Sequence, residues 1–595
     1  LEFDVLFAVH LINCMSRFVT ARSVAFSSRK TYASLVYGTS QARRAAECRA
    51  STRPGVVAGR LCVFSVMTSP IAAVQMRTPQ APTRSGKLDG IPIAKSLPRY
   101  DRAPYEGVED ASAAKDIFMD PPTPATTDAS SAAETVHALL ARARAAQKIY
   151  ARFSQAQLDE VVSAIGWAIM EPTRNRTLAQ IAVRDTGLGD VEDKIVKNHR
   201  KTLGLLRDLR GAVSTGVIAE YPDKGITEIA RPVGIVAGVV PSTNPGATPA
   251  NNIINALKCG NAIVLSPSPK GYSTSAQLLE YIHEELTRVG APVDLVQLLP
   301  AATKALSKEL MKQADLVVVT GSQSNVRAGY SSGTPALGVG AGNVAVIIDE
   351  TADCADAAGK VMRSKIFDNA TSCSSENSLI IDDKVYDRML AALAREGGVV
   401  LSTSEKSTLQ SAMFPEDKLS AAVTAQPVSR ICALAGLNRP ELTKAKCLMV
   451  EEAGTGKHHP FSGEKLSPVL TLYRARDFDH AFQILRAIYD YMGDGHSCGI
   501  YTKHDAHIER LGHEMTVCRV IVNQAHAFAN GGSFDNGLPF SLSMGCGTWG
   551  GNSFSDNLNY RHFMNITRIV RAIPPNEPTV GDIFGEYWAK HKIKN

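Results

Sequence analysis

The segment FDNATSCSSE, residues 367–376, carries the residue types best suited to chemistry in this chain. Cys373 stands among small polar neighbours, with Asp368 five residues before it and Glu376 three residues after it. A thiol in a polar, partly exposed site forms a thiolate readily and can attack a carbonyl carbon. Most free cysteines are instead small buried residues, which is the alternative for Cys373 and our interpretation of the other ten cysteines.

A second candidate, Asn244, lies in the segment PSTNPG. The apolar run at 233–240 predicts a strand before it, and the pattern at 247–259 predicts a helix after it. Polar groups at the carboxyl end of a strand are where an open α/β sheet binds ligands. Because Asn-Pro-Gly is also typical of turns, a purely local role in the turn is the alternative.

Predicted strands and helices alternate along most of the chain, and this alternation must position both residues. Apolar runs predict strands at 233–240, 262–265, 295–299, 316–319, 344–348, 378–382, 469–473, 497–501 and 519–523. Helical periodicity predicts helices from near Ser130, after the Ser154–Gln157 capping box, and at 193–210, 247–259, 273–289, 304–313, 354–367, 384–396 and 478–491. This order indicates an α/β fold with a parallel, doubly wound sheet.

Two further segments have the period-2 pattern of strands. Residues 217–230 form two short alternating runs around Pro-Asp-Lys-Gly, which predicts a hairpin. The run ITRIVRAI at 566–573 also alternates, so we expect it to pair with another strand or with another subunit.

Composition and charge narrow the class of protein. The chain has 595 residues, 44% hydrophobic and 21% charged, which is ordinary for a globular protein. Residues 1–88 contribute +9 to the net charge of +6, so the remainder sums to −3. The basic excess therefore gives no reason to expect nucleic-acid binding by the folded body. The Arg-, Ser- and Ala-rich residues 1–88 read as a basic leader, either a transit peptide or a non-native extension, and residues 89–127 read as a linker.

Cysteine usage and hydropathy bear on the compartment. Eleven cysteines without a CxxC pair argue against a disulfide framework and against a zinc ribbon, and we predict no metal site. The chain has no run of 18 or more apolar residues, so we predict no membrane span. We expect a cytoplasmic protein, or one in an organelle such as the mitochondrion if residues 1–88 are a transit peptide.

Six blocks occur in the order that is characteristic of one enzyme superfamily. They are RPVGIVAGVVPSTNPGATP (231–249), VVVTGS (317–322), GVGAGNVAVIID (338–349), FDNATSCSSENS (367–378), EKLSPVL (464–470) and MGCGTWGGNS (544–553). In these blocks the chain resembles the aldehyde dehydrogenase superfamily over roughly residues 125–575, and its CoA-acylating branch most of all. Residues 522–553 are most similar to the branch members that act on sulfoacetaldehyde.

The resemblance implies an aldehyde dehydrogenase-like fold with a Rossmann-like cofactor domain and an α/β catalytic domain. On this basis we predict a cofactor-binding domain at 128–343, with the oligomerisation hairpin at 217–230, and a catalytic domain at 344–560. The tail at 561–595 would contribute an oligomerisation strand, and a homodimer or homotetramer is expected from the family.

The resemblance also implies roles for individual residues. Cys373 matches the nucleophile, and Asn244 matches the residue whose side-chain amide stabilises the oxyanion together with the backbone N–H of Cys373. Glu464 matches the residue that hydrogen-bonds the nicotinamide ribose, and a surface glutamate is the alternative. Residues 320–322, namely Thr320, Gly321 and Ser322, match the segment lining the cofactor phosphates and the nicotinamide, or else form an ordinary turn.

A glycine stands where hydrolytic members of the superfamily carry a general base. These members have a glutamate at the position of Gly338, and without it the activation of water to cleave a thioester is harder. The acylating branch lacks this glutamate too, and there the thiol of CoA takes the acyl group. The alternative is that another carboxylate acts as the base, and Glu376 is the nearest to Cys373 in sequence.

Further residues are predicted to contact the cofactor and the polar tail of the substrate. Ser266 and Pro269 replace the lysine and glutamate that bind the adenine ribose in hydrolytic members, and Lys270 could attract a 2′-phosphate, so NAD or NADP is expected. His496 matches a histidine of the acylating branch that could assist CoA or position the substrate, or be structural. Three residues are candidates for holding a polar substrate tail such as a sulfonate: His526, Asn530 and Ser533.

Together these residues predict an oxidoreductase that converts an aldehyde and CoA to acyl-CoA through a thioester on Cys373, with reduction of NAD(P)+. Sulfoacetaldehyde is the candidate substrate. The alternatives are an acylating enzyme for acetaldehyde or succinate semialdehyde, a non-acylating aldehyde dehydrogenase, or a catalytically silent oligomeric scaffold.

Overall fold

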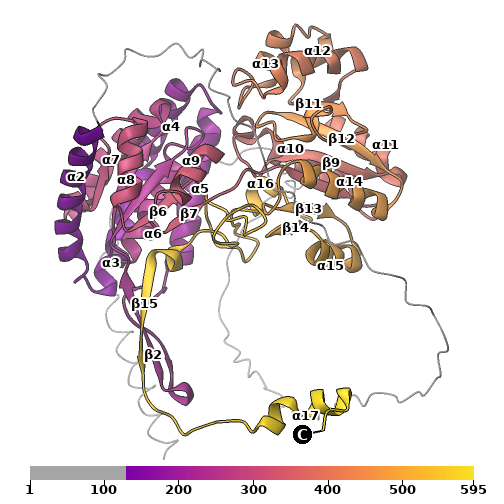
Figure 1. Cartoon of the computed structure of the whole chain (residues 1–595). Coiled ribbons are helices and arrows are strands. Elements are labelled where there is room, and N and C mark those ends of the chain that lie inside the picture. Colours follow the sequence, from indigo (N-terminus) through magenta and orange to yellow (C-terminus); the bar gives the residue numbers. More distant parts are fainter. Residues whose placement is uncertain (1–128, 595) are drawn as a thin grey trace, which may run out of the picture. The chain divides into compact units, whose positions relative to one another are not determined.

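The computed structural model describes residues 129–594, and the predictions for residues 1–88 and 89–127 lie outside this part (Figure 1). Four helices come first along the described chain: α2 (Ala129–Tyr150), α3 (Gln155–Met170), α4 (Pro172–Thr186) and α5 (Val191–Leu209). The Ser154–Gln157 capping box that predicts the start of α3 is present. Among residues 129–594, no helix is both long and apolar enough to cross a membrane.

A five-stranded parallel sheet follows, in the strand order β5-β4-β3-β6-β7. Its strands are β3 (Ile235–Val240), β4 (Ala262–Pro267), β5 (Val296–Leu298), β6 (Leu316–Val319) and β7 (Ala336–Gly338). Its connecting helices are α6 (Ala247–Lys258), α7 (Tyr272–Arg288), α8 (Lys304–Gln313) and α9 (Gln323–Tyr330). Strands β3, β4 and β6 are buried at every residue, as expected for a parallel sheet covered on both faces. Side chains from α2, α3, α6, α7 and α8 share one apolar core with these strands.

A second parallel sheet has seven strands in the order β10-β11-β12-β9-β8-β13-β14. Its strands are β8 (Val344–Ile348), β9 (Glu376–Asp382), β10 (Gly398–Val400), β11 (Cys447–Glu451), β12 (Val469–Ala475), β13 (Cys498–Tyr501) and β14 (Val520–Val522). Its helices are α10 (Cys354–Ile366), α11 (Tyr386–Arg395), α12 (Thr403–Met413), α13 (Val428–Ala435), α14 (Phe478–Tyr491), α15 (Asp505–Glu514) and α16 (His526–Ala529).

Successive side chains of β8 face opposite sides of the seven-stranded sheet, and each side has its own apolar core. Val344, Val346 and Ile348 pack with α10 and α11, whereas Ala345 and Ile347 pack with α14 and α15. The strand and helix alternation predicted from sequence is therefore distributed over two separate parallel sheets. Both belong to one α/β architecture, which confirms the predicted fold class.

The predicted hairpin and tail strand form a small antiparallel sheet of their own. Strand β1 (Gly216–Tyr221) pairs with β2 (Ile226–Pro232), and β15 (Met564–Val570) pairs with β2 along its whole length (Figure 1). Because β15 is an edge strand, one row of its backbone groups is left without a strand partner in the described chain. Helix α17 (Val580–His591) follows, and none of its residues is buried.

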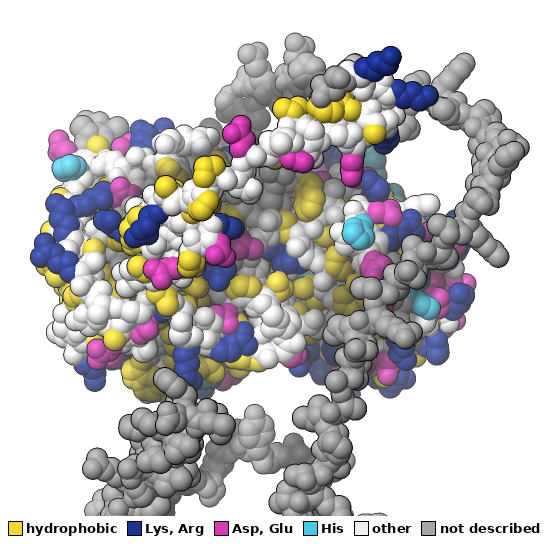
Figure 2. Space-filling model, turned by 90° about the horizontal axis from the view of Figure 1, so that it is seen from below, with side chains coloured by type: hydrophobic (Ala, Val, Ile, Leu, Met, Phe, Trp, Pro, Cys, Tyr) yellow, Lys and Arg dark blue, Asp and Glu magenta, His cyan; other side chains and the backbone are white. Residues whose placement is uncertain are grey.

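Charged side chains are mixed on the surface of the described chain. Figure 2 shows Lys and Arg side chains interspersed with Asp and Glu on the face that it draws, without one large region of a single sign. Such a mixture is typical of solvated surfaces.

Candidate active site

One cavity of ≈ 510 Å³ brings together parts of the chain that are far apart in sequence. Six of the predicted site residues line it: Asn244, Thr320, Gly321, Ser322, Cys373 and Glu464. They come from the carboxyl ends of β3 and β6, from the segment before β9, and from the segment before β12. The carboxyl ends of parallel strands are the expected place for ligand-binding groups.

A left-handed turn places Cys373 at this cavity. Asp368, Asn369 and Ala370 have φ values of 51°, 50° and 60°, in a region that non-glycine residues seldom adopt. Residues held there cost on the order of 1 kcal/mol or more each, so the surroundings must hold them in place. The Asn369 side chain donates to the Gly189 carbonyl, and the Asp368 N–H donates to the Asp193 carboxylate at 2.7 Å.

The buried Asp368 carboxylate is the centre of an ion cluster that supports the turn. It accepts from Lys194 Nζ at 3.0 Å, from Lys197 Nζ at 2.5 Å and from Thr371 Oγ1 at 2.6 Å. Burial opposes ionisation, but the two lysines and these hydrogen bonds together hold the pKa of Asp368 below its usual value. Breaking a buried pair of this kind is strongly destabilising because the remaining charge loses its partner. Helix α5 therefore secures the loop of the nucleophile.

The thiol of Cys373 lies beside an imidazole. Its Sγ is 3.3 Å from His496 Nε2. Burial raises the pKa of the Cys373 thiol to about 12, and the Glu464 carboxylate adds to the rise. Cys373 is partly exposed at the cavity, as expected, but its surroundings disfavour the thiolate, so a readily formed thiolate stays a prediction. The thiol needs a base at the moment of attack.

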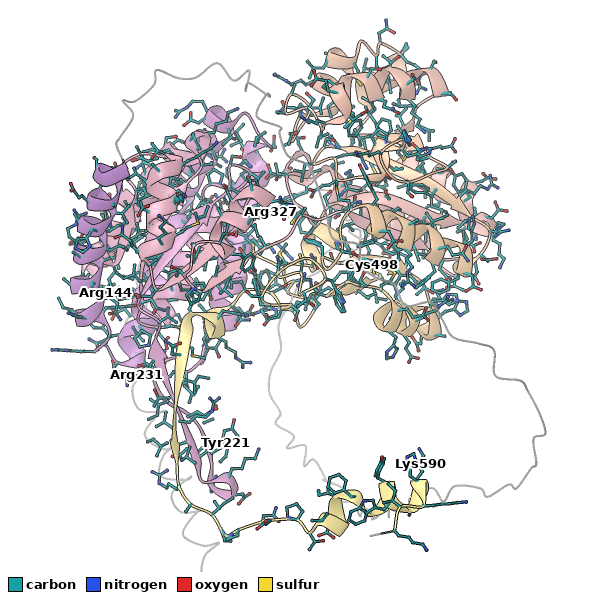
Figure 3. The ribbon with its side chains drawn as sticks, in the orientation of Figure 1. Arg144, Tyr221, Arg231, Arg327, Cys498 and Lys590 are labelled. Carbon is teal, nitrogen blue, oxygen red and sulfur yellow. The ribbon has the colours of Figure 1, made fainter. Side chains whose placement is uncertain are left out.

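His496 is suited to accept that proton. Its Nδ1 is 2.8 Å from Ser497 Oγ, and the tautomer that donates this bond leaves Nε2 as an acceptor facing Cys373. Burial, with the Arg519 cation nearby, lowers the pKa of His496 well below its usual value, so the ring is neutral at pH 7. His496 lies two residues before β13, which begins at Cys498, labelled in Figure 3.

A glycine allows the loop after β7 to approach the nucleophile. A Cβ at Gly342 would lie 2.2 Å from the Cys373 carbonyl oxygen and 3.0 Å from the Cys373 Cβ. No larger residue fits there without moving the backbone at Cys373. Sequence reasoning missed this glycine, which cannot be told from a turn glycine without the contact.

Asn244 is oriented by the same helix that secures the turn. Its Oδ1 accepts from Lys197 Nζ at 3.0 Å, which leaves the NH₂ group as the donor available to a ligand in the cavity. Lys197 thus contacts Asp368 and Asn244 together, and it ties the predicted oxyanion donor to the turn before the predicted nucleophile.

Two buried polar atoms at the cavity have no partner within the described residues. They are Glu464 Oε1 and Ser268 Oγ, both from cavity-lining residues. Burial raises the pKa of Glu464 to about 8, although Lys365 and Lys465 oppose the rise. Buried polar atoms are nearly always hydrogen-bonded, so an unpartnered pair in a cavity fits hydroxyl or phosphate groups of a bound ligand. The residues present therefore fit a ribose-containing cofactor.

The predicted phosphate segment closes β6. Thr320 Oγ1 lies 2.6 Å from Ser543 Oγ, and Ser322 caps α9 by accepting from the Asn325 N–H. Helix α9 therefore begins at the cavity, and the partial positive charge of a helix N-terminus favours phosphate groups.

Four predicted positions do not line the cavity. His496 is buried and meets the cavity through its contact with Cys373 Sγ. Ser266 is buried within β4, Lys270 is exposed beyond that strand, and Gly338 ends β7. A Cβ at Gly338 would lie 2.8 Å from Val326 Cγ1 and 2.9 Å from Tyr330 Cε2, so this position has no room for a side chain in the observed conformation.

The three candidates for the substrate tail contact the protein instead. His526 Nδ1 is 3.0 Å from the Ser374 carbonyl, and Asn530 donates to Ser374 Oγ at 2.9 Å. The Ser533 hydroxyl bonds Asp535 and accepts from Arg200. None of the three lines the cavity. His526 Nε2 and Asn530 Oδ1 have no hydrogen-bond partner among the described residues, so their contact with a substrate tail stays a prediction. They position the segment that follows Cys373 and the loop after α16.

Sequence reasoning also missed the cationic residues of α5. Lys197, Arg200 and Lys201 line the cavity, and Lys194 lies one turn earlier. The signal was present, because Lys194, Lys197 and Lys201 share the helix face of buried Leu205 at i, i+3, i+7 and i+11. Lysines in an apolar stripe mark buried charge that needs partners.

The comparisons with known proteins all point to one family and cover most of the chain. Residues 121–434 match the aldehyde dehydrogenase family. The chain is 61% identical over 463 residues to sulfoacetaldehyde dehydrogenase (acylating) of Cupriavidus necator, covering 78% of this chain and 94% of that protein. It is 36% identical to succinate-semialdehyde dehydrogenase (acetylating) of Clostridium kluyveri, over 73% of this chain and 95% of that protein. An acetylating aldehyde dehydrogenase structure from Geobacillus thermoglucosidasius superposes with a TM-score of 0.73 at 34% identity, covering 76% of this chain and 99% of the other.

Proposed function

The chain belongs to the aldehyde dehydrogenase family, as an oxidoreductase of the CoA-acylating kind, and we propose that it converts sulfoacetaldehyde and CoA to sulfoacetyl-CoA while reducing NAD(P)+. The observation that carries the proposal is the contact of 3.3 Å between neutral His496 and the Sγ of Cys373, which lines a cavity together with Asn244. The 61% identity to an acylating sulfoacetaldehyde dehydrogenase supports the choice of aldehyde.

In the first step, His496 Nε2 accepts the thiol proton as Cys373 Sγ attacks the aldehyde carbon. A new S–C bond forms and the carbonyl oxygen becomes an oxyanion. Because the pKa of the thiol is raised and that of the imidazole is lowered, proton transfer accompanies the attack rather than preceding it. Asn244 Nδ2 and the Cys373 N–H are the proposed donors to the oxyanion. Such a donor typically contributes about 2.7–4 kcal/mol of barrier stabilisation.

The nicotinamide ring, when bound, accepts the hydride that leaves the former aldehyde carbon. Glu464 and Ser268 are the proposed contacts to hydroxyl groups of the cofactor, and the start of α9 is the proposed contact to its phosphates. When the oxyanion reforms the C=O bond and the hydride leaves, a thioester remains on Cys373, and the proton taken from the thiol stays on His496.

Thiol exchange completes the reaction. The sulfur of CoA attacks the thioester carbonyl, the acyl group moves to CoA, and the Cys373 sulfur takes back a proton. Glu464 is the one carboxylate among the described residues that line the cavity, and Glu376 is occupied by Ser364 Oγ at 2.5 Å and by the His526 N–H. The small set of available bases supports transfer to CoA over hydrolysis.

The form of the cofactor and the assembly are further parts of the proposal. After β4 the next acidic residue is Glu280, so no carboxylate follows the strand closely enough to repel a 2′-phosphate, and we propose that NADP is accepted as well as NAD. The free edge of β15 supports a homo-oligomer formed through the small antiparallel sheet.

One assay tests the chemistry. The purified chain is given sulfoacetaldehyde and NAD+ or NADP+, with and without CoA, and reduced cofactor is followed by absorbance. We expect CoA-dependent turnover that Cys373→Ala lowers on the order of 10⁴-fold or more. Cys546→Ala is the matched control, because Cys546 is buried and does not line the cavity, and it should retain turnover. Full turnover without CoA would refute the acylating reaction, and an active Cys373→Ala variant would refute the nucleophile.

A further inference from the structure

Among the residues that line the cavity, three are cationic, Lys197, Arg200 and Lys201, and one, Glu464, is acidic. Lys197 shares the carboxylate of Asp368 with Lys194. In residues 129–594 neither Arg200 nor Lys201 forms a salt bridge, although Asp535 interacts electrostatically with Arg200. The cavity lining therefore has an excess of cationic side chains that an anionic ligand would offset.

Lys201 is the more deeply buried of these two cations. Its side chain keeps only 7% of its exposure, and Nζ donates to the carbonyl oxygens of Gly531 at 2.6 Å and Ser541 at 3.2 Å. An ammonium group has three N–H donors, so one remains for a ligand. Burial, with Arg200 and Lys197 nearby, lowers the pKa of Lys201 well below its usual value, and a bound anion would reverse part of that shift.

Arg200 is held in place but has donors to spare. Its Nη2 donates to the Phe528 carbonyl at 2.9 Å and to Ser533 Oγ at 3.0 Å. Within the described chain its Nη1 and Nε atoms have no hydrogen-bond acceptor. The guanidinium stacks over the Phe528 and Phe540 rings, at 5.2 Å and 5.3 Å from the ring centroids. The rings and the carbonyls fix the plane of the group, so it is pre-organised for an oxyanion.

Lys201 lies close enough to the reacting sulfur to interact with it electrostatically, and Glu464 interacts with Cys373 as well. Arg200 lines the same cavity. The nucleophile thus shares its cavity with cationic groups of α5 and with one acidic group. A substrate whose anionic group is one methylene away from the aldehyde carbon would place that group toward α5 and away from Glu464.

We propose that Arg200 and Lys201 form the sulfonate subsite of this enzyme and determine its preference for an aldehyde whose anionic group is one methylene away from the carbonyl. The inference rests on the proposed function and names the residues that recognise its substrate. A sulfonate has three oxygen acceptors, which match the spare donors of Arg200 and the third N–H of Lys201. The residues act in binding and orientation, because neither touches the reacting carbon atom.

The test measures selectivity rather than activity. The variants are Arg200→Gln and Lys201→Gln, which keep a hydrogen-bond donor and remove the charge. The ratio of kcat/KM for sulfoacetaldehyde to kcat/KM for acetaldehyde is expected to fall about 10- to 100-fold in each variant, as for the loss of a hydrogen bond to a charged group. Arg200→Lys keeps the charge and should retain most of the ratio.

The matched control lies two turns along the same helix. Arg207 also stacks over Phe540, at 4.9 Å, but it is exposed, it pairs with Asp208, and it does not line the cavity. Arg207→Gln should leave the ratio unchanged. Isethionate, a sulfonate without an aldehyde, gives a second readout, because its inhibition constant should rise in the Arg200 and Lys201 variants.

The outcomes separate this inference from the reaction itself. An unchanged ratio in both variants, an equal loss for both aldehydes, or an unmoved inhibition constant for isethionate would each overturn the subsite. In those cases the wild-type enzyme still turns over sulfoacetaldehyde with CoA. If the wild-type enzyme oxidised acetaldehyde with CoA but left sulfoacetaldehyde unreacted, both the proposed substrate and the subsite would be wrong, while the acylating chemistry would stand.

Discussion

Helix α5 and the segment before β12 line the same cavity, but they differ in whether their buried ionisable groups have partners. On α5, Lys194 and Lys197 are paired to Asp368, which is itself fully buried. On the other segment, Glu464 Oε1 has no partner within the described chain, and the pKa of Glu464 is raised. The paired cluster holds the polypeptide in place, and the unpaired carboxylate is available to a ligand.

This difference teaches how buried polar residues divide between stability and function. A satisfied cluster contributes to folding because each charge has a partner that compensates for its lost hydration. An unsatisfied group costs folding free energy and is retained where a ligand supplies the missing partner. The two segments should therefore respond differently to the removal of a carboxylate.

The largest effect on stability is expected at the paired segment. Asp368→Asn leaves two buried lysines without a carboxylate and weakens the left-handed turn before Cys373. The free energy of unfolding should fall by about 3–5 kcal/mol, measured by urea denaturation. Asp356→Asn is the control, because Asp356 forms an exposed pair with Lys360 on α10 and should cost less than about 1 kcal/mol. Equal losses for the two variants would contradict the role of the cluster.

The opposite response is expected at Glu464. Glu464→Gln removes a buried carboxylate that has no partner, so the free energy of unfolding should stay the same or rise. The KM for the nicotinamide cofactor should rise by up to about tenfold, as for the loss of one hydrogen bond. Initial-rate kinetics with varied cofactor would check this. A strongly destabilised variant with an unchanged KM would place Glu464 with the structural residues instead.

The pH dependence of stability separates the two carboxylates further. For Glu464 the folded pKa of about 8 is above the ordinary value of 4.5, so the folded state holds a proton that the unfolded state has lost. The contribution of Glu464 to the free energy of unfolding is largest below pH 4.5 and decreases as the pH rises to about 8. Asp368 has a lowered pKa in the folded protein, so its contribution is present above pH 3.8 and is lost on acidification.

The free energy of unfolding, measured between pH 5 and pH 9, would show the contribution of Glu464. The difference in this free energy between the wild-type enzyme and Glu464→Gln should change with pH in that range. Glu376, whose pKa is raised to about 7, contributes a similar slope to both proteins, so its contribution cancels in the difference. A difference that is constant with pH would mean that Glu464 is not protonated in the folded protein.

The smallest effect is expected at an exposed cation outside both segments. Lys270→Ala should lower kcat/KM for NADP by up to about fivefold and leave that for NAD unchanged, because an exposed charge contributes less than about 1 kcal/mol. Raising the salt concentration should remove the difference. An equal decrease for both cofactors would argue against a contact with a 2′-phosphate.

Much of the architecture could be predicted from the sequence. Helix 304–313 and strands 316–319 and 344–348 have the predicted ends, because continuous apolar runs flanked by turn residues are a local signal. Helices α4 and α12 were missed, since their polar composition gives a weak periodicity, and α13 was missed because it has only 8 residues. The division into two sheets depends on strand pairing between distant segments, which local patterns do not specify.

For the site, the sequence by itself determined which residue types are available: a cysteine, an asparagine after a strand, and a glutamate before another strand. These signals are short segments whose chemistry follows from residue type and from the ends of elements. Only the tertiary structure decided that burial raises the pKa of the thiol, that His496 lies beside it, and that Arg200 and Lys201 line the cavity without a salt bridge in the described chain. The physical reason is that pKa values and charge balance depend on burial and on partners brought together from far along the chain.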